Sequence, residues 1–217
     1  VQLSYNISGR VYVGEKVLEN VVVSCGELMA TTNQNGEFEF REVIGKFNLT
    51  FEKEGYTFDE LNNLFGTQEI VVKAMYSISG NVVSGDNIVA GADVEVISSE
   101  LSSSIFAKTN EKGEFLVAGI KGTAQIIVTK DGYSIATISG FTDVSNDNVL
   151  ELAYSVTLNF TTSGVTIYVN GENYLTTDSN SITIPNLTGT NTLKFEKKNS
   201  SFIPNNFKVS EPGTFSI

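Results

Sequence analysis

Hydrophobic and polar residues alternate with a period of two along most of this chain. In residues 5–13 the odd positions are apolar or glycine, and the even positions between them are mostly polar. The same alternation returns in residues 21–25 and 47–51, and residues 69–73 are a further expected strand. A period of two is typical of a half-buried β-strand, whose successive side chains point to opposite faces of a sheet. The pattern therefore predicts an all-β protein whose strands each bury one face.

The alternating segments recur as copies of one unit. Residues 76–82 repeat residues 5–11, and the text Asn-x-x-Gly-Glu-Phe and Lys-x-Gly-Tyr of residues 33–56 returns 77 positions later. A third, more divergent copy keeps an offset of 144 from the first over a long span, so that Phe51 corresponds to Phe195. Self-similarity at a fixed period is the mark of a tandem array. We expect three domains, at residues 1–75, 76–153 and 154–217.

No flexible linker separates the first two copies. The strand at residues 69–73 leads through Ala74 and Met75 directly into Tyr76, without a run of Pro, Gly or Ser. The last strand of one domain should therefore continue into the first strand of the next, which predicts stiff coupling between the modules.

Two glycines of the repeat mark turns. Asn35-Gly36 predicts a β-hairpin over residues 31–40, because this dipeptide readily takes positive φ. In the third copy Gly36 becomes Asn180 and Gly55 becomes Asn199. Since Asn is the residue that best replaces Gly in the left-handed region, we expect positive φ at both positions in all copies. Residues 56–66 should form a loop with room for one helical turn.

Four motifs carry a family likeness. They are Ile-Ser-Gly-x-Val at residue 7, a Val-rich second strand, Thr-Asn-x-x-Gly-Glu-Phe at residue 32 and Lys-x-Gly-Tyr at residue 53. Together they resemble the carboxypeptidase regulatory-like, or transthyretin-like, domain. The first two copies match closely, whereas the third has Leu158 near the first-strand Gly and lacks both turn glycines and the Tyr. The resemblance implies three tandem seven-stranded antiparallel Ig-like or transthyretin-like β-sandwiches. It brings no catalytic residues, because in that family these domains are accessory modules.

The composition argues against several classes of function. The formal net charge of −11 disfavours nucleic acid and anionic membrane surfaces as partners. Histidine is absent, and with it the commonest general base and the usual zinc ligand. The single cysteine, Cys25, aligns with Val96 and Val169 and should be a core residue instead of a reactive thiol. We expect no catalytic residue, no cofactor and no dedicated metal site.

One acidic cluster is a candidate for weak calcium binding. Asp143, Asn146, Asp147 and Asn148 offer carboxylate and amide oxygens, but their spacing departs from the D-x-D-x-D-G pattern of a dedicated site. A solvated Asx-rich turn is the favoured interpretation, and weak calcium binding at Asp143 and Asp147 stays open. Lesser candidates are the pairs Asp86-Asn87 and Asp59-Glu60.

Other chemistries have weaker support in the residues. Exposed aromatic rings for stacking on sugars are expected only in the third domain, at Tyr168, Tyr174 and Phe202. An internal Lys–Asn isopeptide crosslink is disfavoured, because the first strands carry no Lys at inward positions. Glu37 and Glu39 could serve acid–base hydrolysis, but both lie on the polar phase of a strand.

These observations lead to two functional hypotheses. The first is a non-enzymatic spacer or stalk of a secreted or cell-surface protein, whose partners are the other domains of a longer, processed precursor. The second is an adhesion or ligand-binding module that contacts a protein or a glycan through the third domain or through a polar loop at residues 98–104. No apolar run approaches the roughly 20 residues of a membrane-spanning helix.

Overall fold

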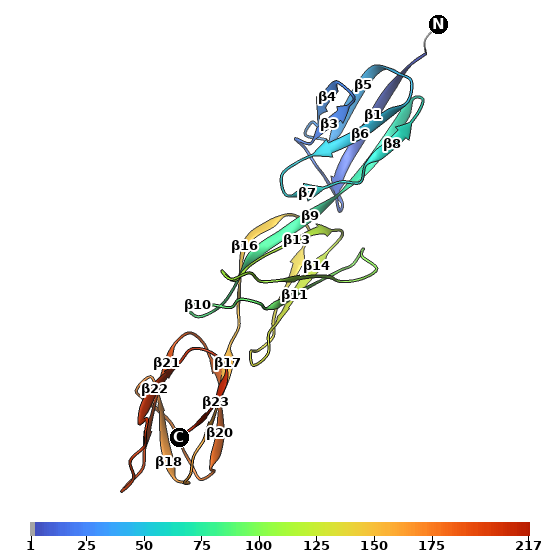
Figure 1. The fold of residues 1–217 in the computed structure, drawn as a ribbon. Helices are drawn as coiled ribbons and strands as arrows, with labels where there is room; N and C mark the ends of the chain where they lie inside the picture. Colours follow the sequence, from blue (N-terminus) through green and yellow to red (C-terminus); the bar gives the residue numbers. More distant parts are fainter. Residues whose placement is uncertain (1–2) are drawn as a thin grey trace.

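The protein is a row of β-sandwiches (Figure 1). The computed structural model describes residues 3–217, and every regular element in that range is a β-strand. Within the same range no helix is long and apolar enough to cross a membrane. The predicted all-β class with tandem sandwiches is confirmed.

The first sandwich pairs one sheet around β1 with a second sheet around β3 and β6. The first sheet joins β1 (Ser4–Val13) to β2 (Lys16–Val17), to β5 (Glu37–Ile44) and to the start of β9 (Gln68–Ser84). The second sheet has the order β4-β3-β6-β8 and contains β3 (Val22–Cys25), β4 (Leu28–Thr31), β6 (Phe47–Glu52) and β8 (Leu61–Leu64). The short β7 (Tyr56–Thr57) pairs with β9 at Met75 and Tyr76.

The second sandwich repeats this plan. Its first sheet uses the second half of β9, flanked by β13 (Glu114–Ile120) and β16 (Ser145–Glu151), with β10 (Asn87–Ile88) at one end. Its second sheet has the order β12-β11-β14-β15 and contains β11 (Asp93–Ser98), β12 (Ile105–Lys108), β14 (Ala124–Thr129) and β15 (Ala136–Phe141). The strand β9 therefore belongs to both sandwiches, as the absence of a linker predicted.

The third sandwich is built in the same way from strands of its own. One sheet has the order β20-β17-β23 and contains β17 (Tyr154–Asn159), β20 (Ser181–Leu187) and β23 (Gly213–Ser216). The other has the order β19-β18-β21-β22 and contains β18 (Val165–Val169), β19 (Glu172–Thr177), β21 (Asn191–Glu196) and β22 (Asn206–Val209).

Strands pair antiparallel throughout, except that the first and last strands of each sandwich run parallel. This parallel pairing explains the glycine of the first-strand motif. A Cβ on Gly9 would lie 2.5 Å from the carbonyl oxygen of Ile70, and one on Gly80 would overlap the carbonyl of Asn148 in the same way. The antiparallel arrangement expected from the resemblance therefore holds except at one parallel strand pair in each sandwich.

The alternating positions form the cores, as predicted. Val21, Val23 and Cys25 are buried, and burial raises the pKa of the Cys25 thiol, which keeps it protonated and unreactive. The buried residues form two clusters. One extends without interruption from Ile7 to Leu152 through the first two sandwiches, and the other fills the third sandwich.

Two local predictions are wrong. Residues 31–40 do not form a hairpin, because β4 pairs with β3 whereas β5 pairs with β1 in the opposite sheet. The Asn-Gly turn therefore carries the chain from one sheet to the other, and a period of two cannot reveal which strands pair. Residues 61–64 form strand β8 and no helical turn, because their apolar residues pair across to β6.

The prediction for the turn glycines is half right. Gly55 and Gly132 both have φ of 81°, and Asn199 keeps the left-handed conformation with φ of 60°. Gly36 is also left-handed, but Asn180 is not. In the third sandwich that corner is closed by side chains instead: Thr177 Oγ1 accepts from the Ser179 N–H at 3.0 Å, and Ser179 Oγ accepts from the Ser181 N–H at 3.2 Å.

Candidate functional site

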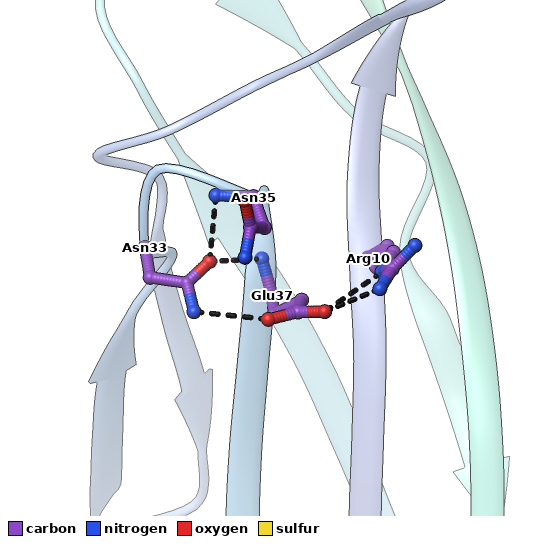
Figure 2. Close-up of polar contacts among 4 residues, drawn as sticks. All are labelled: Arg10, Asn33, Asn35 and Glu37. Carbon is purple, nitrogen blue, oxygen red and sulfur yellow. Dashed lines mark hydrogen bonds and ion pairs between the residues drawn. The ribbon is translucent and has the colours of Figure 1, made fainter.

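The Asn-x-x-Gly-Glu-Phe motif forms a closed polar cluster on the first sandwich (Figure 2). Asn33 Oδ1 accepts hydrogen bonds from the N–H groups of Asn35 and Glu37, both at 2.9 Å. Its amide nitrogen donates to Glu37 Oε2 at 3.1 Å, and Arg10 Nε donates to the other carboxylate oxygen at 3.1 Å. The Asn33 amide and then the Arg10 guanidinium hold the pKa of Glu37 below its usual range. The Asn33 amide and the Glu37 carboxylate are thus both engaged by neighbouring groups.

The second copy builds the same cluster without the arginine. Asn110 Oδ1 accepts from the N–H groups of Lys112 and Glu114 at 2.9 and 3.0 Å, and its amide donates to Glu114 at 2.9 Å. Asn81 stands opposite Glu114 where the first sandwich has Arg10. The motif therefore serves to shape a turn, and it does not present a reactive group.

The Lys-x-Gly-Tyr motif has a different role, because it contacts the next sandwich. At the first junction the carbonyl of Gly55 accepts from both the N–H and the hydroxyl of Ser77, each at 3.0 Å. Tyr56 pairs across to Tyr76, and its hydroxyl donates to Asp143 Oδ1 at 2.5 Å. A Cβ on Gly55 would lie 2.9 Å from a methyl group of Val144, so only glycine allows this approach.

The second junction repeats these contacts. A Cβ on Gly132 would lie 2.5 Å from Pro212, and by strand register Pro212 corresponds to Val144. Tyr133 forms a bridge to Tyr154, with ring centroids 6.1 Å apart in an edge-on arrangement. Burial and the nearby Glu211 carboxylate raise the pKa of Tyr133. We call this shared contact, made by Gly55-Tyr56 and again by Gly132-Tyr133, the Gly-Tyr clasp.

Each clasp closes over a buried tyrosine at the start of the next sandwich. Tyr76 and Tyr154 are each 1% exposed. The hydroxyl of Tyr76 lies 2.9 Å from the carbonyl oxygens of Gly122 and Phe141, and that of Tyr154 lies 2.8 Å and 2.9 Å from those of Gly189 and Val209. Burial raises the pKa of Tyr76 to about 12, with a smaller contribution from Asp143. These tyrosines tie the two sheets of the receiving sandwich together below the clasp.

The turn after the first strand adds a second contact at each junction. At the first junction Lys16 lies 4.0 Å from Asp143. At the second, the N–H of Gly189 donates to the carbonyl of Ser84 at 2.9 Å, and the Asn87 amide donates to the carbonyl of Ser210 at 3.4 Å. The junctions are thus specific and multipoint contacts.

The acidic cluster at residues 143–148 is occupied by protein groups. Asp143 accepts from Tyr56 and from the N–H of Val144 at 2.8 Å, and it faces the Lys16 ammonium. The amide of Asn148 donates to the carbonyl of Ser79 at 2.7 Å. Within residues 3–217, no three His, Cys, Asp or Glu residues are gathered as metal ligands would be.

Asp147, the other acidic residue of that cluster, and the acids of the two lesser candidate pairs belong to no group of three possible metal ligands. Asp147 is an exposed residue with φ of 57°, in the bulge where β16 pairs with β9. Asp59 lies 3.6 Å from Lys121, and Asn87 belongs to the second junction described above.

The third-sandwich aromatics divide into two kinds. Tyr174 is 42% exposed, and Tyr168 donates to Glu196 at 3.0 Å while the Lys194 ammonium lies 5.5 Å from its ring centroid. Phe202 differs from the prediction, because its ring packs edge-on against the core rings of Phe160 and Phe195. A loop residue was expected to point outward, but a large apolar ring next to a core opening is more stable inside.

The other candidate groups are engaged in local contacts. In the 98–104 loop, Ser98 donates to the carbonyl of Lys121, Ser99 Oγ accepts from the Thr123 N–H at 2.9 Å, and Ser104 donates to Glu95 at 2.7 Å. Glu39 forms an exposed ion pair with Arg41, as Glu37 does with Arg10. The inward residues of the first strands are apolar, which leaves no lysine at the position that an isopeptide crosslink needs.

The junction role of Lys-x-Gly-Tyr was missed from the sequence, although a signal was present. In the first and second copies the motif stands shortly before the last strand, which leads directly into the next copy. A repeated turn at that place could have indicated contact with the following copy.

Comparisons with known proteins give distant matches. No family model matches the chain. The chitinase ChiA of Flavobacterium johnsoniae is 27% identical over 179 residues, which cover 75% of this chain and 11% of that protein. Among solved structures, the Bacillus anthracis TIE protein superposes over 100% of this chain and 50% of its own, with 15% identity and a TM-score of 0.33. The major pilin subunit of Bacillus cereus superposes over 99% of both chains, with 11% identity and a TM-score of 0.33. These TM-scores are too low to establish a shared fold.

Proposed function

We propose that this chain is a non-enzymatic spacer in a secreted or cell-surface protein, which holds other domains of a longer polypeptide at a fixed separation. The observation that carries the proposal is the pair of built junctions, each with a Gly-Tyr clasp over a buried tyrosine. A flexible tether makes no fixed contacts between the domains that it joins. A rigid spacer needs such contacts, because the stiffness of a row of sandwiches is limited by its junctions.

The proposal keeps the three domains at residues 1–75, 76–153 and 154–217, and the membership of the carboxypeptidase regulatory-like family for the first two. The shared strand β9 and the bridge between Tyr133 and Tyr154 support boundaries near Met75 and Ala153. The first-strand glycine, the Asn turn and the clasp occur in both of these domains and support their common family.

The match to a chitinase suggests the kind of protein in which the spacer occurs. The chain spans 11% of the length of a protein named as a chitinase, so a segment similar to this one occurs within a much longer protein of that name. We propose that this segment separates a polysaccharide-degrading domain from an anchor or a binding domain in its own polypeptide. The segment itself would require no cofactor or metal for that role.

Small-angle X-ray scattering on the full chain tests the spacer. A compact globule of this length has a radius of gyration of about 17 Å. We expect a clearly larger value and the pair-distance distribution of a rod, with a peak near the sandwich width and a long tail. A symmetric distribution with a compact radius would contradict the proposal.

Recognition of a glycan or a protein is the second candidate, through the third sandwich or the 98–104 loop. It is favoured by the exposed ring of Tyr174 and by the Tyr168 hydroxyl beside Lys194 and Glu196. Pull-down of the full chain on insoluble chitin and a glycan array would reveal it, with Tyr174→Ala as the matched variant. If the chain binds neither chitin nor any glycan on the array, glycan recognition is contradicted and the spacer role is the remaining proposal.

A further inference from the structure

We infer that the exposed end of the first sandwich, formed by Tyr5, Ile44, Gly45 and Phe65, is an acceptor face for another sandwich that carries a Gly-Tyr clasp. This acceptor face rests on the tandem organisation proposed above and adds a partner to it. The partner is a module of the same repeat, which docks by the geometry already present twice within the chain.

Strand register identifies the face. Tyr5 pairs with Val43 in the first sandwich, as Tyr76 pairs with Ile120 and Tyr154 with Leu187 in the other two. Tyr5 is therefore the counterpart of the two tyrosines that lie beneath the clasps. By the same register Gly45 corresponds to Gly122 and Gly189, and Gly189 contacts Ser84 and Gly85 of the preceding sandwich at the second junction.

The face is uncovered in the first sandwich only. Tyr76 and Tyr154 are fully buried, whereas Tyr5 is half-buried and stacks edge-on against Phe65, with ring centroids 5.1 Å apart. Phe65 is 59% exposed and Ile44 is 52% exposed. A Cβ on Gly45 would meet open space, although the main chain there is left-handed with φ of 74°. This end of the first sandwich thus combines three partly exposed apolar side chains with a left-handed glycine, the conformation that Gly189 has at the second junction.

The residues of the acceptor face also indicate the chemical character of the contact with an incoming sandwich. By strand register, Gly66 of the first sandwich takes the place of Asp143 and Glu211, the acids near the clasp tyrosines. Phe65 takes the place of Thr142 and Ser210. An incoming clasp would therefore meet an aromatic ring and no carboxylate. The docking would be more apolar than at either internal junction, and the incoming tyrosine would pack its ring against Phe65 with its hydroxyl toward solvent.

An extended chain tests the acceptor face directly. A copy of residues 76–153 is placed before Tyr5, so that Ala153 of the added copy is followed by Tyr5 as it is by Tyr154 in the natural chain. At the second junction the N–H of Gly189 donates to the carbonyl of Ser84 in the preceding sandwich, so the N–H of Gly45 should gain the same bond from the added copy. We expect hydrogen exchange of the Gly45 amide, followed by NMR, to slow about tenfold or more relative to the natural chain.

Two controls make the result decisive. In the first, Gly132→Val in the added copy only should remove the protection of Gly45, because the clasp can no longer approach. In the second, residues 3–153 replace the added copy, which supplies the same clasp on a sandwich that keeps its shared core and guards against poor folding of the first donor. Unchanged exchange at Gly45 with both donors, or protection that survives Gly132→Val, would overturn the inference. Neither outcome depends on the scattering of the natural chain, which tests the spacer separately.

Discussion

At the first junction β9 runs for 17 residues from one sandwich into the next, whereas at the second junction β16 ends at Glu151 and β17 begins at Tyr154. The cores differ in the same way. The first two sandwiches share one continuous hydrophobic cluster, and the third has its own, with Tyr133 packed against both. The Gly-Tyr clasp is nevertheless present at each junction.

This difference separates two contributions to coupling. The clasp fixes how one sandwich sits on the next, because it depends on a glycine, a tyrosine and a receiving tyrosine that both junctions possess. The shared strand and shared core decide whether the two sandwiches also unfold together, since disrupting one exposes apolar residues of the other. We therefore expect the first two sandwiches to unfold as one cooperative unit and the third to unfold separately.

The largest predicted effect comes from the buried tyrosines. Tyr76→Ala should lower the free energy of unfolding of the joint first and second transition by about 3–5 kcal/mol, as large-to-small core changes do. Tyr154→Ala should cost a similar amount in the third sandwich and leave the joint transition almost unchanged. Differential scanning calorimetry on the full chain separates the two. If Tyr154→Ala shifted every transition equally, the separation of the third sandwich would be wrong.

The same two tyrosines predict an alkaline loss of stability. The pKa of Tyr76 is raised from 10.0 to about 12, so its neutral form stabilises the fold at pH values below 10, and that stability is lost as the pH rises through about 12. The loss would reach up to about 3 kcal/mol. The pKa of Tyr154 is also raised by burial, but the Asn191 amide donates to its hydroxyl oxygen at 3.0 Å and opposes the shift.

Unfolding by denaturant between pH 9 and 12, with phenolate absorbance at 295 nm as a second probe, measures this difference. The joint transition should lose more stability than the third sandwich. A Tyr76→Phe variant supplies the control, because it keeps the ring and removes the titrating group. Equal losses in wild type and Tyr76→Phe would contradict the assignment to Tyr76.

The clasp glycines come next in size. Gly55→Val and Gly132→Val combine left-handed backbone with steric overlap on the neighbouring sandwich, and each should cost roughly 2 kcal/mol or more. Gly91→Val is the matched control, because Gly91 has φ of 66° but open space around it. The excess over this control measures the overlap alone.

The two glycine variants should change the shape of the chain in solution to different extents. After Gly132→Val the third sandwich keeps no shared strand or core, so scattering should show a broader distribution of shapes. After Gly55→Val the continuous β9 should preserve the alignment of the first two sandwiches despite the lower stability. The same broadening in both variants would show that the clasp, and not the strand, sets the stiffness.

Much of this fold could be predicted because its signals are local. The period of two placed the strands and the buried face, and the repeat of Asn-x-x-Gly-Glu-Phe predicted turns that indeed close on themselves through Asn33 and Asn110. Strand pairing could not be predicted in the same way, because an Asn-Gly turn suits a hairpin and a crossing between sheets equally well. Asn180 was misread because a side-chain turn at Thr177 replaced a backbone conformation.

The Gly-Tyr clasp could not be predicted from neighbouring residues, because it is a contact between two sandwiches. Gly55 needs to be glycine because of Val144, which lies in another sandwich 89 positions later, and no spacing rule connects the two. A residue chosen for contact across a junction looks like a turn residue when only its own unit is considered. The candidate site was therefore visible in the sequence as a motif, while its role required the junction itself.

The smallest prediction concerns the single hydrogen bond that distinguishes the two clasps. The Tyr56 hydroxyl donates to Asp143, whereas Glu211 acts on Tyr133 only through its charge. Tyr56→Phe should therefore cost about 1.5 kcal/mol, the lower end of the range for a hydrogen bond to a charged group, and Tyr133→Phe less than about 0.5 kcal/mol. Chemical denaturation of both variants measures the contrast, and a double-mutant cycle with Asp143→Asn assigns it. Because Asp143 also faces Lys16, a coupling energy near zero between Tyr56 and Asp143 would mean that the acid is held at the junction by the lysine and that both clasps work by packing alone.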